Sequence, residues 1–83
     1  MSAAIGDPIR DDAEIVISAD ILGSKIVVVV LQPLNPKSKL VFDVYSNNQL
    51  RHIGLDYEGV GRALSHYATG LLYNHAKARG ERA

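Results

Sequence analysis

The sequence contains no cysteine, few aromatic residues and no net charge. Without cysteine, disulfides and thiolate metal sites are excluded. A net charge of zero argues against a strongly basic nucleic-acid-binding module. The chain is 47% hydrophobic and only 6% aromatic, so we expect a mostly aliphatic core. Its 83 residues form one domain, which buries only about 60% of its unfolded surface. Tight packing or oligomerisation must therefore supply the remaining stability.

Long hydrophobic segments are also missing. The most apolar run, residues 26–31, reads Ile-Val-Val-Val-Val-Leu, whereas a membrane-spanning helix needs about 20 apolar residues. Residues 1–6 lack the basic and apolar regions of a signal peptide, so we expect a cytoplasmic protein. No catalytic, metal-binding or nucleotide-binding motif stands out. We therefore expect no cofactor, no metal and no enzymatic activity.

The first half of the chain predicts a β-hairpin. Residues 13–22 alternate, with Ile15, Ile17 and Ile21 on one face and Val16 on the other. Residues 26–31 do not alternate, which indicates a strand covered on both faces. Gly23-Ser24 between them is suited to a two-residue turn, because glycine tolerates positive φ. That turn would place Ile21 opposite residue 26 and Ile17 opposite residue 30.

A second hairpin follows a loop that contains Pro33 and Pro36. Residues 39–46 and 49–55 are the predicted strands, joined at Asn47-Asn48, since asparagine adopts left-handed conformations readily. An uninterrupted register predicts these opposite pairs: Val44 with Arg51, Phe42 with Ile53, Leu40 with Leu55, Tyr45 with Leu50, and Asp43 with His52.

The remaining segment predicts a long helix. Asp56 is a candidate N-cap, and Glu58 in the first turn complements the helix dipole. Gly80 is a plausible C-terminal stop. An apolar stripe at helical spacing comprises Tyr57, Val60, Leu64, Tyr67 and Leu71. Gly59, Gly61 and Gly70 each cost the helix about 1 kcal/mol relative to alanine. We expect close packing on the sheet, or on another chain, to compensate.

The fold class is therefore α+β: a four-stranded antiparallel meander sheet of two hairpins, followed by one long C-terminal helix packed on one face. We divide the chain into a flexible N-terminal arm (1–12), a single ββββα domain (13–80) and a C-terminal tail (81–83). The predicted core comprises Ile15, Ile17, Ile21, Ile26, Val28, Val30, Leu40, Phe42, Val44, Ile53 and Leu55 on the sheet, with Val60, Leu64, Tyr67, Leu71 and Leu72 on the helix.

Two sets of side chains contain groups that can act as acids, bases or metal ligands. Asp43 and His52 form the one acid–base pair that the register brings together, and a carboxylate beside an imidazole can prepare a general base. Because no nucleophile lies nearby, we interpret them as a cross-strand charged pair. His66 and His75 are nine residues apart on the helix, so they cannot share a metal ion within one chain.

The face of the sheet away from the helix carries more apolar side chains than exposure to solvent requires. It comprises Val16, Val27, Val29, Leu31, Val41, Tyr45 and Leu50. Soluble monomers seldom expose such a patch. We interpret it as the interface of a homodimer or of a contact with another protein. The alternative is that the N-terminal arm folds over it, using Ile5 and Ile9.

These observations favour a small protein-interaction module, such as a phage- or plasmid-type inhibitor, an antitoxin or an accessory subunit. The alternative is a single-stranded nucleic-acid-binding protein. The β-β-β-β-α order resembles the transcriptional-coactivator and Whirly single-strand-binding families in topology alone. Such a protein needs a basic groove and stacking aromatic rings. The residues that could contribute are Lys25, Lys37, Lys39, Arg51 and Tyr45.

Overall fold

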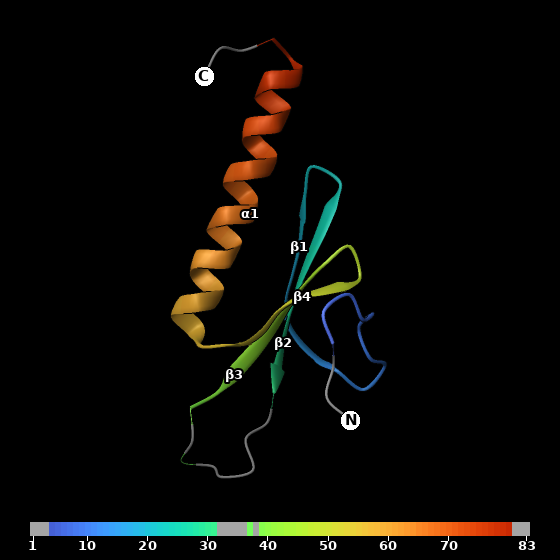
Figure 1. The fold of residues 1–83 in the computed structure, drawn as a ribbon, viewed down its shortest axis with the longest axis vertical. Coiled ribbons are helices and arrows are strands. Elements are labelled where there is room, and N and C mark those ends of the chain that lie inside the picture. Colours follow the sequence, from blue (N-terminus) through green and yellow to red (C-terminus); the bar gives the residue numbers. More distant parts are fainter. Residues whose placement is uncertain (1–3, 32–36, 38, 81–83) are drawn as a thin grey trace.

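The computed structural model describes residues 4–31, 37 and 39–80. Its elements are β1 (Glu14–Ile21), β2 (Ser24–Leu31), β3 (Val41–Ser46), β4 (Gln49–Leu55) and α1 (Tyr57–Ala78). The strands form one antiparallel sheet in the order β1-β2-β3-β4, and α1 lies along one face of it (Figure 1). The predicted α+β fold is confirmed. Both prolines of the predicted loop, and the predicted C-terminal tail, lie outside the described residues.

The turn between β1 and β2 differs in position from the predicted one. Leu22 and Gly23 have φ angles of 51° and 86°, and positive φ at both central residues is the conformation of a primed hairpin turn. The N–H of Gly23 donates a 3.1 Å hydrogen bond to Oδ1 of Asp20. Ile21 therefore pairs with Ser24. The predicted register was wrong by two residues, a shift that keeps each side chain on the same face.

A β-bulge in β1 changes the faces of two residues. Ile15 pairs with Val29 and Ile17 pairs with Val28, so Val16 is an additional residue on its strand. Such a residue reverses the alternation of side chains beyond it. Val16 was predicted on the face away from the helix, and this was wrong: it lines a cavity on the α1 side. Ile15, predicted in the core, is 50% exposed.

The second hairpin begins as predicted and then departs from the expected register. Asn47 and Asn48 both have positive φ, and Tyr45 pairs with Leu50. Two irregularities in the β3–β4 ladder then shift the partners, so that Val44 pairs with His52 and Phe42 pairs with Leu55. The other predicted pairs were therefore wrong: Val44 with Arg51, Phe42 with Ile53, Leu40 with Leu55, and Asp43 with His52.

The helix begins and ends where the sequence predicted. Oδ1 of Asp56 accepts a 2.7 Å hydrogen bond from the N–H of Gly59, which makes Asp56 the N-cap. At the other end Gly80 has a φ of 85°, and its N–H donates to the carbonyl oxygen of Lys77. The 22 residues of α1 extend over about 33 Å. Only Val60 and Ala63 of the helix are buried, both in its first two turns.

Two apolar clusters lie on opposite faces of the sheet. Residues 26–30 of β2 are all buried, which confirms that this strand is covered on both faces. The cluster under α1 contains Ile26, Val28, Val44 and Val60. The cluster on the other face contains Val27, Val29, Tyr45 and Leu50. The prediction of a larger core under the helix was wrong for five residues that are exposed: Ile15, Ile17, Leu40, Ile53 and Leu72.

Candidate functional site

The face that we predicted as an interface is covered by the described part of the N-terminal arm, residues 4–12, together with Ala13 (Figure 1). Ile9 and Ala13 pack against its apolar cluster. The N–H of Gly6 donates to the carbonyl oxygen of Leu50, and the N–H of Leu50 donates to that of Asp7, both at 2.8 Å. The arm therefore lies along β4 as a further extended segment. The alternative prediction, in which the arm folds over this face, is what the structure contains for Ile9. It was wrong for Ile5, which is 60% exposed.

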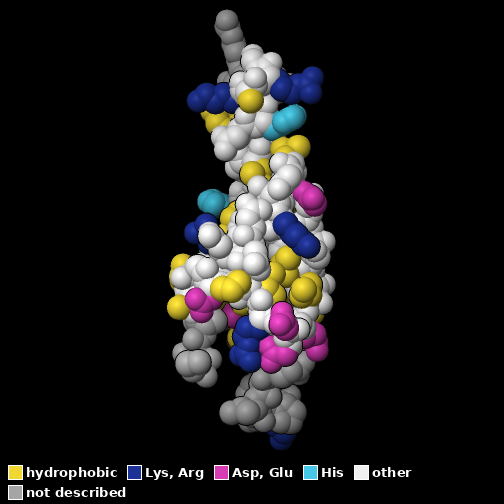
Figure 2. All heavy atoms as spheres, turned by 90° about the vertical axis from the view of Figure 1, so that its right-hand side faces the viewer, with side chains coloured by type: hydrophobic (Ala, Val, Ile, Leu, Met, Phe, Trp, Pro, Cys, Tyr) yellow, Lys and Arg dark blue, Asp and Glu magenta, His cyan; other side chains and the backbone are white. Residues whose placement is uncertain are grey.

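The residues of the predicted interface consequently fall into three groups. Val27, Val29, Tyr45 and Leu50 are each at most 4% exposed, so they are not available to a partner in this structure. Val16 lies on the opposite side of the sheet. Leu31 at the end of β2 is exposed, and Val41 is half-buried. Figure 2 shows the face opposite α1, where some hydrophobic side chains remain visible among acidic ones.

Tyr45 also bears on the nucleic-acid alternative, because it is the aromatic ring that stacking would require. It is 3% exposed, packed between the sheet and the arm. Burial raises the pKa of its hydroxyl, and the negative charges of Asp43 and Asp7 raise it further. A ring enclosed in this way offers no face to a nucleotide base.

The basic residues proposed for nucleic-acid contacts are spread over the sheet. Lys25 is at the start of β2 and Lys39 precedes β3, so they lie near opposite ends of these paired strands, roughly 20 Å apart. The side chain of Arg51 donates a 2.7 Å hydrogen bond to Oε1 of Gln49 on β4. Lys37 is in the connection that leads to β3. These four residues do not line a common groove among the described cavities.

Asp43 and His52 are not a pair. Asp43 is at the register position opposite Val29, on the arm side, and its Oδ1 accepts a 3.0 Å hydrogen bond from the N–H of Gly54. His52 faces α1, where its ring meets that of Tyr67 at a centroid distance of 5.9 Å and an angle of 78°. The backbone irregularity beside Arg51 places the two groups on opposite faces of the sheet.

An apolar groove lies between β1 and the first half of α1. We call it the β1–α1 groove, and its volume is about 250 Å³. Tyr57 and Ile17 at its rim are 72% and 38% exposed. Apart from its chain neighbours and the adjacent backbone of α1, no described atom lies within 4 Å of the position of a Cβ on Gly61. The residues that line it are Val16, Ile17, Val28, Phe42, Tyr57, Val60, Gly61 and Leu64.

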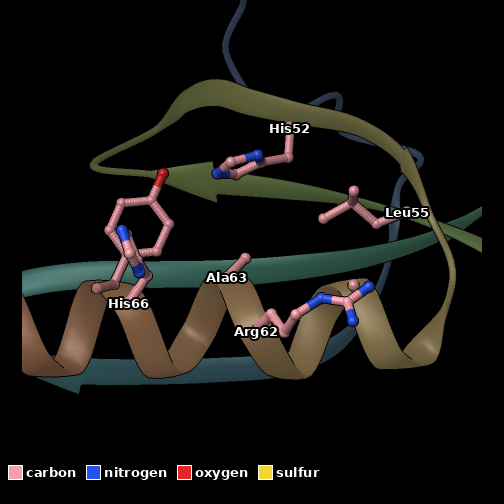
Figure 3. Close-up of a pocket in the computed structure, with 7 residues that line it drawn as sticks. His52, Leu55, Arg62, Ala63 and His66 are labelled. Atoms are coloured by element: carbon pink, nitrogen blue, oxygen red, sulfur yellow. The ribbon is translucent and has the colours of Figure 1, made fainter.

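A second cavity, of about 550 Å³, lies on the other side of α1 beneath β4. We call it the imidazole pocket, since it is lined by His52, Leu55, Gly59, Arg62, Ala63, His66 and Tyr67 (Figure 3). Burial raises the pKa of the Tyr67 hydroxyl, and the positive charge of Arg51 opposes this. The sequence did not reveal this pocket, because His52 reaches it only through the irregularity in β4. Gly54 could signal only the other irregularity of the ladder, between His52 and Leu55, since an isolated glycine in a strand often marks a bulge. The irregularity at Arg51, which turns His52 toward the pocket, has no such signal in the sequence.

Comparisons with family models, with curated proteins and with solved structures found no match. Within the described residues no helix has the length and apolarity needed to cross a membrane. The same residues contain no group of three or more His, Asp or Glu side chains placed to hold a metal ion.

Proposed function

We propose that this chain is a non-catalytic protein-interaction module that works as a homodimer. We further propose that the β1–α1 groove, and not the arm-covered face, makes the contact between the two copies. The observation that carries this proposal is the set of exposed apolar side chains on the α1 side of β1 and at the start of α1. Val16, Ile17 and Tyr57 are 47%, 38% and 72% exposed although they border a cluster of buried residues.

The groove continues as an apolar stripe along the helix. At 100° per residue, Gly61, Leu64, Ala68 and Leu72 lie on the same side of α1 as Tyr57. Leu72 is 55% exposed, in a half of the helix that contributes no buried residue. An exposed apolar patch is typical of a protein–protein contact.

Glycine in the middle of a helix also supports a contact with another chain. Gly61 destabilises α1 by about 1 kcal/mol relative to alanine. Within the described chain nothing approaches the position of its Cβ, so packing inside the monomer does not compensate for this cost. A second backbone or side chain seated in the groove would use the space that Gly61 leaves open.

A second copy is the partner that we propose. In a two-fold dimer the same patch on each copy must be complementary to itself. The β1–α1 groove combines a concave apolar strip with projecting side chains at its rim, Tyr57 and Ile17, which can enter the groove of the other copy. Small domains with limited hydrophobic cores commonly gain stability by forming oligomers.

The solution mass of the purified chain tests the proposal. Light scattering at several concentrations should give twice the mass of one chain, falling toward that of a monomer on dilution. A monomer mass at all concentrations would contradict it. The position of Asp43 and His52 supports the proposal that the module is non-catalytic. These two side chains could have formed a general base, but they lie on opposite faces of the sheet.

A further inference from the structure

The imidazole pocket has a chemistry that the proposed dimer does not use. Three of its lining side chains, His52, Arg62 and His66, can donate hydrogen bonds from nitrogen, and none of its lining residues is acidic. Leu55, Ala63 and the ring of Tyr67 supply apolar contact surface. A volume of about 550 Å³ lies in the range of small-molecule sites, which span about 300 to 1,000 Å³.

The donors approach the cavity from two elements. Arg62 and His66 are four residues apart, so they lie on successive turns of one side of α1. His52 extends from β4 toward the helix (Figure 3). Its ring is held edge-on against Tyr67, which restricts its orientation. Arg51 on the same strand adds positive charge that reaches Tyr67.

We propose that the imidazole pocket binds a phosphate monoester of a small, flat, apolar group. The guanidinium of Arg62 is suited to two oxygens of the phosphate at once, and the two imidazoles supply further donors. The flat group then lies against Leu55, Ala63 and Tyr67.

This site is independent of the proposed dimer contact. The β1–α1 groove is on the side of α1 that carries Tyr57, Gly61 and Leu64, whereas the pocket is on the side that carries Arg62 and His66. Loss of dimerisation and loss of ligand binding are therefore separate outcomes.

Titration of the ¹⁵N-labelled full chain with phenyl phosphate at low ionic strength tests the proposal. We expect saturable shifts of the amide signals around His52, Ala63 and His66, with a dissociation constant on the order of 1 mM. Inorganic phosphate has the phosphate group without the ring, and phenol has the ring without the phosphate group. Each should bind about tenfold more weakly than phenyl phosphate. Substitution Arg62→Gln should weaken phenyl phosphate binding by about tenfold, because it removes a charge-assisted contact.

Arg79→Gln is the matched control. Arg79 is an exposed arginine at the C-terminal end of the same helix, outside the pocket, so binding should be retained. Failure of phenyl phosphate to saturate any signal by about 10 mM would overturn the proposal. So would equal binding of phenyl phosphate and inorganic phosphate, or an equal loss in both arginine variants.

Discussion

The backbone N–H of Leu50 donates a 2.8 Å hydrogen bond to the carbonyl oxygen of Asp7. This bond joins the N-terminal arm to β4, and Ile9 of the arm packs against the apolar cluster on the same face of the sheet. The arm thus serves as the cover that the apolar face of the sheet requires. As a result, the face that the sequence predicted as an interface with a second chain is occupied by residues 6–13 of the same chain.

Substitution Ile9→Ala should destabilise the fold by about 1 to 2 kcal/mol. The side chain is half-buried, so the cost falls below the 2 to 5 kcal/mol of a fully buried isoleucine. Urea unfolding measures the change. Ile5→Ala is the matched control, because Ile5 is 60% exposed on the same arm and should shift stability by less than about 0.5 kcal/mol. Equal effects of the two substitutions would show that the arm does not cover the face.

Asp43 should stabilise the irregular β4 strand through the N–H of Gly54. The carboxylate is 5% exposed, and it accepts a 3.0 Å hydrogen bond from that group. Asp43→Ala leaves the N–H without its acceptor, and we expect a loss of about 1 to 3 kcal/mol in unfolding free energy. Asp43→Asn keeps an oxygen acceptor of the same shape and should recover most of the loss. An asparagine variant as unstable as the alanine variant would contradict this role.

Stability should fall in alkaline solution because of two tyrosines, the buried Tyr45 and the half-buried Tyr67. Burial raises the folded-state pKa of both Tyr45 and Tyr67 above the ordinary value of 10.0. Each group therefore contributes stability that is fully present below pH 10 and is lost as the pH rises through the folded-state pKa. Thermal unfolding between pH 9 and 11.5 should show a decline that becomes shallower in Tyr45→Phe. If stability declines equally in the double variant Tyr45→Phe/Tyr67→Phe, titratable groups other than these two tyrosines cause the alkaline loss of stability.

The sequence predicted the elements well because their signals are local. Alternation marked β1, continuous β-branched residues marked a strand buried on both faces, and Asp56 and Gly80 marked the helix ends. The Asn47-Asn48 turn was also predicted, since two asparagines in a short link favour positive φ.

Registers and faces were predicted less well because they depend on the placement of single residues. The turn was predicted at Gly23-Ser24, but Leu22 and Gly23 are the residues with positive φ, and this moved the register of the first hairpin by two positions. The bulge at Val16 and the irregularity beside Arg51 then moved individual side chains to the opposite face. Both candidate cavities depend on these shifts, since Val16 lines one and His52 lines the other. The regular alternation of side chains along a strand, with a period of two residues, cannot predict such irregularities.

The dissociation constant of the dimer in a matched pair of tyrosine variants tests the central claim most directly. Tyr57 lines the β1–α1 groove and is 72% exposed, whereas Tyr73 is 50% exposed on the same helix and lines neither cavity. Sedimentation equilibrium should show that Tyr57→Ser weakens the dimer by at least about tenfold, because it removes an aromatic anchor that enters the groove of the other copy. Tyr73→Ser should leave the dissociation constant within about twofold of the unsubstituted chain. Equal dissociation constants for the two variants, or a monomer in every case, would contradict the account.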